Sequence, residues 1–190
     1  MPEAGVERIT VMGIGNPLVK DEGVGVRVIE VMMSTLKFPD NVALVDAGTM
    51  GMGILNLFQD CDYLLVIDAV DGTGEPAGTV VRMTPEDLAP NQIKHSMHDI
   101  RLVDVLEAAM LMGSQPKADC IGIQILDMDG MEIRLSEPVE AAVPAAVAAA
   151  LVVLAEHGVV AEPCENVSLD GRVLEAIRTG SDTWRNEEAR

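Results

Sequence analysis

The chain has 190 residues, of which 48% are apolar, and this suits one folded domain with a core of ordinary size. Its 13 basic and 31 acidic residues leave a formal charge of −18. That charge argues against nucleic-acid partners and against anionic membrane surfaces, since both require a basic footprint.

The cysteines and the first residues of the chain bear on its compartment. Cys61, Cys120 and Cys164 are widely spaced and form no CxxC pair, which indicates a reducing setting. Residues 1–10 lack the basic and apolar segments of a signal peptide. We therefore expect a cytoplasmic protein without membrane insertion, and we expect it to act as a monomer.

The first half of the chain alternates apolar strands with helices. Residues 7–15 (ERITVMGIG) predict a buried strand, and the helical spacing of apolar residues from 24 to 36 predicts a helix. Short strands are expected at 42–46 and 63–68, the second being apolar on both faces like a central strand of a parallel sheet. A further strand is expected at an edge, over 78–83.

A helix is next expected over 102–110, starting near Ser96, and a buried strand over 120–125. Ser96 and Asp99 resemble a capping box for that helix.

The last expected helix is rich in alanine. Ser136 can cap it, Gly158 follows its end, and Pro144 should kink it or mark its effective start. Its apolar stretch, 141–155, is short for a membrane span, so a buried helix is the better interpretation.

This order of elements, with short connections, predicts an α/β fold: three layers, with a mainly parallel twisted sheet flanked by helices on both faces. We expect a single domain over residues 1–160. Residues 161–190 lose periodicity and are expected to form a polar tail.

Carboxylates follow the ends of the first three strands. The loop after the first strand carries Asp21 and Glu22, the second strand ends at Asp46, and the third ends at Asp68. In open parallel sheets the carboxyl ends of the strands form one ligand-binding rim. Any single Asp after a strand also serves turns and helix caps. Several carboxylates on one rim repel each other, however, so a cation or a shared proton should relieve them.

A metal fits this rim better than a phosphate does. The Gly-x-Gly of the opening loop lacks the third glycine of a dinucleotide fingerprint, because Leu18 stands there, and the loop has no Lys-Ser/Thr. A neutral His98 in the first turn of its helix could ligate a metal. Glu22, Asp68 and His98 together would suit a borderline divalent metal such as nickel or zinc.

The other two histidines are weighed against His98. His157 ends the last helix, a position that suits a solvated imidazole. His95 lies in the loop before the helix of His98. GxSxG and HExxH motifs are missing, so a hydrolase of this sequence would have to rely on carboxylates and a metal.

Four segments in order resemble one known family, the [NiFe]-hydrogenase maturation endopeptidases. They are GIGNPLVKDEGVG, VDAGTMGM, VIDAVDG and HDIRLVDVLEA, and the match runs from about residue 8 to about residue 158. The resemblance implies a twisted sheet flanked by helices. It also implies a protease that removes the C-terminal extension of the hydrogenase large-subunit precursor after nickel insertion.

The resemblance further implies roles for individual residues. The family's metal contacts fall on Glu22, Asp68 and His98, and its motif selects His98 over His95. Their metal would be nickel supplied by the substrate, with no organic cofactor. The loop from Asp46 to Thr49 would face the same cleft, and Asp46 and Asp68 are candidates for the general base that activates water.

Two alternatives remain open from the sequence. One is a nickel-binding maturation chaperone that uses the same three ligands without cleaving. The other is a nucleotide-binding α/β domain with a phosphate at Gly13–Gly15, which the missing third glycine disfavours.

Overall fold

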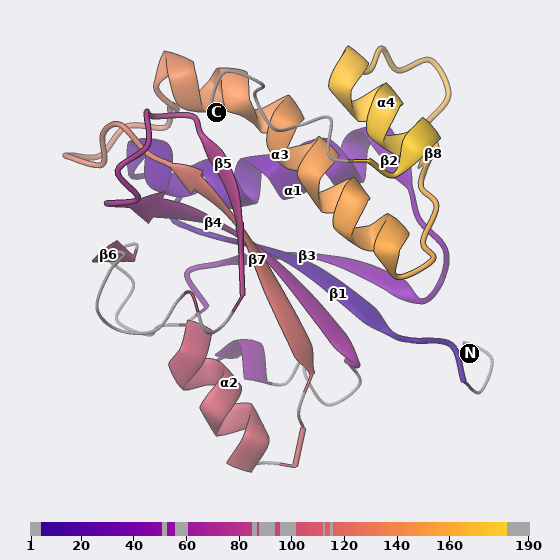
Figure 1. Cartoon of the computed structure of the whole chain (residues 1–190). Coiled ribbons are helices and arrows are strands. Elements are labelled where there is room, and N and C mark those ends of the chain that lie inside the picture. The colour runs from indigo at the N-terminus through magenta and orange to yellow at the C-terminus, as the bar shows by residue number, and fades with distance from the viewer. Residues whose placement is uncertain are drawn as a thin grey trace.

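The structure is a computed structural model that describes residues 5–50, 53–55, 61–84, 87, 94–95, 102–111, 113–114 and 116–181. Within these residues, one twisted sheet runs in the strand order β3-β1-β4-β7-β5, and β6 pairs with β4 off this path (Figure 1). The strands of this sheet are β1 (Ile9–Ile14), β3 (Val42–Gly48), β4 (Tyr63–Asp71), β5 (Val80–Met83), β6 (Lys94–His95) and β7 (Lys117–Gln124). Strands β3, β1, β4 and β7 are parallel, whereas β5 and β6 are antiparallel to their neighbours.

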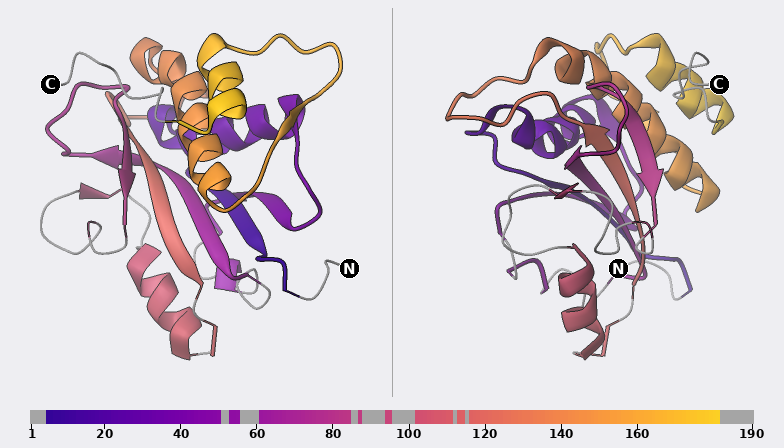
Figure 2. Two further views of the ribbon diagram at one scale, coloured as in Figure 1. Left: turned by 45° about the vertical axis from the view of Figure 1, so that its right-hand side comes forward. Right: turned by 60° about the vertical axis from the view of Figure 1, so that its left-hand side comes forward.

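Helices cover both faces of this sheet. Helices α1 (Val24–Thr35) and α3 (Glu137–Glu156) lie together on one face, and α2 (Leu102–Leu111) lies beyond the other (Figure 2). The predicted fold class, a three-layer and mainly parallel α/β architecture, is therefore confirmed.

The two faces of β4 explain why its sequence is apolar without alternation. Leu65 and Ile67 belong to the core cluster beneath α1 and α3. Leu64 and Val66 belong to a second cluster, against which Leu106 of α2 packs. Both faces of a central strand are buried in such a sheet, so each position requires an apolar side chain.

Among the elements that the structure describes, helix α3 contributes the most buried residues to the core. It is long and apolar enough to cross a membrane by length and composition, but 72% of its most apolar window is buried inside the protein. This confirms the interpretation of residues 141–155 as a buried helix. Pro144 lies inside the helix, which begins at Glu137, so Pro144 does not mark its start. Ser136 occupies the N-cap position, but its side chain makes no capping hydrogen bond.

The structure differs from the expected polar tail within residues 161–181. Strand β8 (Glu162–Pro163) pairs with β2 (Leu36–Lys37), and α4 (Gly171–Thr179) packs against α3. Val173 and Ala176 of α4 are buried. A short amphipathic helix needs few apolar residues to join a core, which is why its periodicity is weak in the sequence.

Candidate active site

The glycines of the opening loop bring the start of α1 against the ends of two strands. A Cβ atom on Gly25 would collide with the carbonyl oxygen of Ile14, at the end of β1, and with that of Ile67, within β4. A Cβ atom on Gly13 would in turn collide with the carbonyl oxygen of Gly25. These glycines permit close approach of backbone to backbone. This packing explains why glycine occupies these positions without a bound phosphate.

Asp21, the first of the two acids in the opening loop, is a structural residue. It is fully buried in the short 3-10 helix η1 (Lys20–Gly23). Its carboxylate accepts hydrogen bonds from the N–H groups of Leu126 and Asp127, each at 3.0 Å. It also accepts from the N–H of Ser136 at 2.6 Å and from the Ser136 hydroxyl at 2.8 Å. Asp21 thus holds the segment between β7 and α3 against η1.

The residues of the opening loop do not by themselves separate Asp21 from Glu22, and only the family resemblance assigns the metal contact to Glu22. The partners of Asp21 lie 105 to 115 residues away along the chain. Nothing local to the sequence of the opening loop identifies them. The pair of acids itself does not show which of the two the distant segment engages.

Glu22 lies on the same turn and is also buried, with 5% of its surface exposed. The N–H of Glu22 donates to the carbonyl of Val19 at 3.1 Å, which closes the turn. Helix η1 contacts β4, the strand that carries Asp68. The structure therefore brings the turn of Glu22 to the strand of Asp68, as the rim prediction requires.

Asp68 lies near the carboxyl end of β4 and is partly exposed. Its carboxylate accepts a hydrogen bond from the N–H of Ala69 at 2.8 Å. Burial, and then the charges of Asp68 and Asp119, raise the pKa of the Cys120 thiol. Cys120 pairs in register with Val66 and belongs to the core cluster on the α2 side. Val66 and Val70, two residues before and after Asp68 on β4, belong to that same cluster, so by alternation Asp68 faces the α2 side of the sheet.

Asp46 is placed differently. It is exposed, and it pairs in register with Gly13, which also pairs with Ile67. Leu44, two residues earlier on β3, packs against the core cluster on the α1 side. Because side chains alternate along a strand, Asp46 faces the α1 side, opposite to Asp68.

The expected histidine ligand, His98, lies outside the described residues. His95 belongs to β6, where it pairs in register with Val70 of β4, and Lys94 pairs with Asp71. These pairs lie beyond Ile67, where the pairing of β1 with β4 ends. Among the residues that the structure describes, no group of three His, Cys, Asp or Glu side chains is arranged to hold a metal ion.

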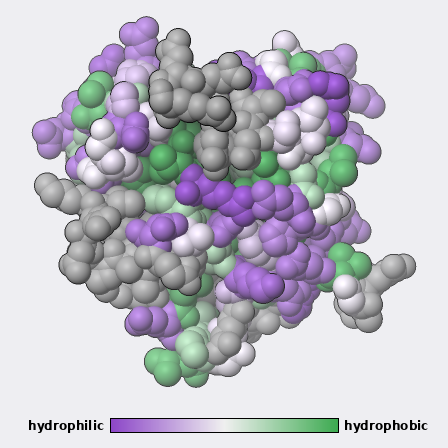
Figure 3. Space-filling view, viewed as in Figure 1, coloured by the Kyte–Doolittle hydropathy of each residue, from purple (hydrophilic) through white to green (hydrophobic). Residues whose placement is uncertain are grey.

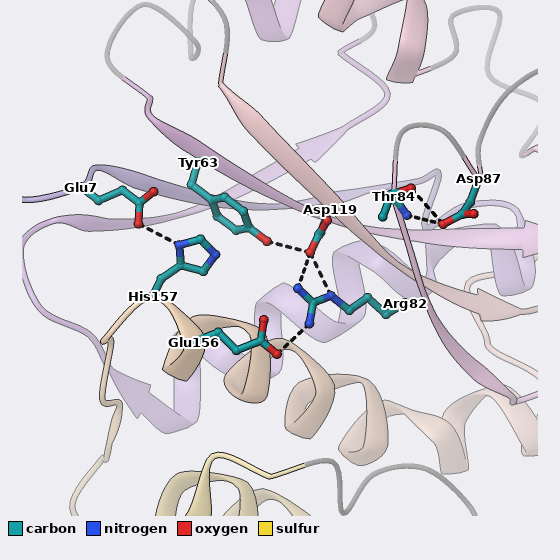
Figure 4. A network of polar contacts seen from close by, with 8 residues as sticks. All are labelled: Glu7, Tyr63, Arg82, Thr84, Asp87, Asp119, Glu156 and His157. Atoms are coloured by element: carbon teal, nitrogen blue, oxygen red, sulfur yellow. Dashed lines mark hydrogen bonds and ion pairs between the residues drawn. The ribbon is translucent and has the colours of Figure 1, made fainter.

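A separate polar network lies at the amino ends of the parallel strands, far along the sheet from this rim (Figure 4). The Arg82 guanidinium donates to Asp119 at 2.8 Å through Nε and to Glu156 at 2.8 Å through Nη1. The Tyr63 hydroxyl also donates to Asp119, at 3.0 Å. Burial, and then the charge of Asp119, raise the pKa of Tyr63. The network ties β5, β7 and α3 together.

His157 belongs to this end of the molecule and is not the solvated imidazole that its position predicts. Its Nδ1 lies 2.7 Å from Oε2 of Glu7, and its ring stacks on Tyr63 with centroids 3.7 Å apart (Figure 4). Only 19% of its side chain is exposed. The solvated interpretation is wrong because residues from the other end of the chain fold over the end of α3.

Hydrophilic residues cover much of the face shown in Figure 3, with apolar residues exposed between them. The loop between β7 and α3 protrudes from the margin of the molecule near the carboxyl ends of the strands (Figures 1 and 2).

Comparison with known proteins identifies the family. A family model described as "Hydrogenase maturation protease" matches residues 26–153. The hydrogenase 2 maturation protease of Escherichia coli is 35% identical over 163 residues, which covers 84% of this chain and 98% of that protein. The hydrogenase expression/formation protein HupM of Azotobacter chroococcum is 38% identical over 161 residues, or 83% of this chain and 76% of that protein.

Solved structures agree with this. The hydrogenase maturating endopeptidase HybD from E. coli has a TM-score of 0.75 and 33% identity, covering 84% of this chain and 99% of that one. A [NiFe] hydrogenase maturation protease from Thermococcus kodakarensis shares the fold, with a TM-score of 0.64 at 24% identity over 75% of this chain and 96% of that one. The chain therefore belongs to the hydrogenase maturation protease family, the endopeptidases that process the precursor of the hydrogenase large subunit.

Proposed function

We propose that this protein removes the C-terminal extension of a nickel-loaded [NiFe]-hydrogenase large-subunit precursor, with Glu22, Asp68 and His98 contacting the nickel that the precursor carries. The observation that carries the proposal is the placement of Glu22. It is buried on a turn that contacts β4, and Asp21 of the same turn bonds the segment before α3. The nickel is part of the substrate.

The donor set suits this metal. Two carboxylates and one imidazole form an oxygen-rich site with one nitrogen, and nickel accepts both kinds of ligand. The position of β6 supports a role for His98. Pairing between His95 and Val70 brings the chain to the carboxyl end of β4 only three residues before His98.

The two candidates for the general base differ in position. A base must lie within hydrogen-bond reach of the water that it activates, directly or through one further water. Asp68 is itself one of the proposed metal contacts and faces the α2 side of the sheet, whereas Asp46 faces the α1 side. Asp68 is therefore the better candidate for activating water, and Asp46 is better suited to a role at the margin of the cleft.

The chemistry then follows from position. Contacts from this protein to the nickel would hold the scissile bond near the carboxylates, which converts a bimolecular attack into an oriented one. A metal next to a peptide carbonyl also polarises it for attack by water. A precursor without nickel would lack the group that aligns it, so cleavage would wait for metal insertion.

The test is the intact mass of a large-subunit precursor mixed with this protein, with nickel inserted and without. The proposal predicts loss of a C-terminal peptide from the nickel-loaded precursor alone. Cleavage of both forms at the same rate would refute the role of nickel while leaving the protease activity in place. A loaded precursor that binds but keeps its mass would instead support the chaperone alternative.

A further inference from the structure

The segment between β7 and α3 exposes several large apolar side chains close to the candidate site. Met131 is 80% exposed, Ile133 79% and Leu126 63%. Leu18, in the opening loop, is 45% exposed. We call these four residues the apolar rim. Side chains of this size rarely gather on a surface without a partner.

The apolar rim is built from two segments that the backbone joins directly. The N–H of Glu132 donates to the carbonyl of Leu18 at 2.9 Å, and the N–H of Lys20 donates to the carbonyl of Glu132 at 2.9 Å. Met131 and Ile133 flank Glu132 in the sequence. The two segments therefore present Leu18, Met131 and Ile133 as neighbours, and they do so with ordered backbone.

Two carboxylates fix the rim in place. Asp21 accepts hydrogen bonds from the N–H groups of Leu126 and Asp127 at one end of the segment and from Ser136 at the other. Asp127 in turn forms an ion pair with the Lys20 ammonium at 2.5 Å. A surface held in one conformation loses little entropy when a partner binds, and this favours affinity.

The rim is also continuous with the site. Lys20, Asp21 and Glu22 are consecutive residues of η1. The apolar rim is attached to η1 at Lys20 and Asp21, and Glu22 lies on that same turn. A macromolecule whose metal contacted Glu22 would therefore lie next to the apolar rim.

We propose that the apolar rim is a docking surface for the large-subunit precursor and that it binds an apolar segment of the precursor next to its metal site. The proposal rests on the proposed function, because it takes the precursor as the occupant. A protease that selects one bond in a large folded subunit needs contacts beyond that bond, and specific protein interfaces bury about 1,600 Å² in total. Apolar anchors surrounded by polar residues dominate such interfaces. Asp127, Asp129 and Arg134 supply polar surroundings here.

The test compares two double variants. In the first, Met131→Ser and Ile133→Ser remove the two most exposed side chains of the rim. In the matched control, Met110→Ser and Leu111→Ser remove apolar residues that are 59% and 90% exposed at the end of α2. Binding is measured by calorimetry with nickel-free and with nickel-loaded precursor, and cleavage of the loaded precursor by intact mass over a range of concentrations.

We expect the rim variant to bind both forms of the precursor at least roughly tenfold more weakly, as for the loss of interface anchors. Its KM should rise in proportion while kcat at saturating precursor stays at the wild-type value, and the α2 control should match wild type in both. Equal binding and equal KM in the rim variant would overturn the proposal. A second outcome would also overturn it: sedimentation shows that the wild-type protein is a dimer, and the rim substitutions break this dimer without changing KM. The apolar rim would then bind a second copy of this chain.

The binding measurement separates this proposal from the role of nickel. Docking predicts that the rim variant weakens binding of the nickel-free precursor as well. If nickel proves irrelevant to cleavage, the rim can still be judged from binding and KM. If the rim proves irrelevant, the nickel dependence of the wild-type enzyme remains measurable.

Discussion

The carboxylate of Asp21 accepts hydrogen bonds from both the N–H and the hydroxyl of Ser136, at 2.6 and 2.8 Å. This contact ties the turn before α1 to the residue before α3. The position of Ser136 in the sequence suggests that its hydroxyl caps α3, but the hydroxyl instead donates to Asp21. Asp21, the first acid of the opening loop, therefore stabilises the turn that carries the site. Glu22, the second acid, is the candidate metal contact.

Replacing Asp21 with asparagine should lower the free energy of unfolding by about 3 kcal/mol, because a buried charge that accepts several hydrogen bonds is lost and an amide N–H₂ faces other donors. Urea unfolding of the two proteins measures this difference. Asp129→Asn, on the exposed part of the same segment, is the matched control and should leave stability within about 0.5 kcal/mol of wild type. Equal stabilities for Asp21→Asn and Asp129→Asn would contradict a structural role for Asp21.

Replacement of the two candidate general bases should have unequal effects. Asp68→Asn should reduce kcat for the precursor by about 100-fold or more, the usual contribution of a general base. Asp46→Asn should reduce it by less than about tenfold, because Asp46 faces the other side of the sheet. Single-turnover cleavage of a nickel-loaded precursor measures both. The reverse order of effects would show that Asp46, and not Asp68, activates the water.

The ion pair between Lys20 and Asp127 should make stability depend on pH in the acid range. The hydrogen bond from Lys20 lowers the pKa of Asp127 in the folded protein. A lowered carboxyl pKa contributes stability that is fully present above the unfolded value, about 3.9 for Asp, and that is lost as the pH falls through the folded value. The stability difference between wild type and Asp127→Asn should thus be constant above about pH 5 and shrink below pH 4.

Urea unfolding at several pH values between 2.5 and 7, on the order of one measurement per half unit, would follow this difference. Asp40→Asn, which removes another exposed carboxylate, is measured in parallel as the control for a change of surface charge. A difference for Asp127→Asn that grows as the pH falls would have the wrong sign for the proposed ion pair.

The three cysteines should differ in reactivity. Burial raises the pKa of the thiols of both Cys61 and Cys120, and the Cys61 thiol also donates to the carbonyl of Tyr63. Cys164 is only partly buried. Because the thiolate is the reactive form, a thiol reagent at neutral pH should label Cys164 alone in the folded protein, and all three after unfolding. Peptide mass mapping identifies the labelled cysteines. Early labelling of Cys120 would contradict its burial in the core.

Much of the fold could be predicted from the sequence, because the central strands of a parallel sheet are buried on both faces. Strands such as β1 and β4 appear as continuous apolar runs, and the alanine-rich α3 stands out for the same reason. Strand β6 has two residues, and α4 has two buried side chains. Neither leaves a pattern long enough to detect.

For the candidate site, the sequence predicts which strand ends carry carboxylates but not which way their side chains face. The carboxylates do follow the ends of successive strands, and the family motifs mark the same residues. Alternate residues of a strand point to opposite sides of the sheet, and this alternation decides the sides to which Asp46 and Asp68 point. A strand that is apolar on both sides does not reveal the alternation in its sequence. The role of Asp21 depends on Ser136, more than 100 residues away, a distance over which sequence patterns carry no information.

The proposed contact between Glu22 and the nickel of the precursor is tested most directly by the rate at which Glu22→Gln cleaves a nickel-loaded precursor. Glutamine preserves the shape of the side chain and removes its charge. Glu30→Gln, which makes the same change on the exposed side of α1, is the control. We predict that Glu22→Gln slows cleavage by about 100-fold or more while keeping wild-type stability. Glu30→Gln should cleave at the wild-type rate. Cleavage of the loaded precursor by Glu22→Gln at the wild-type rate would contradict the claim.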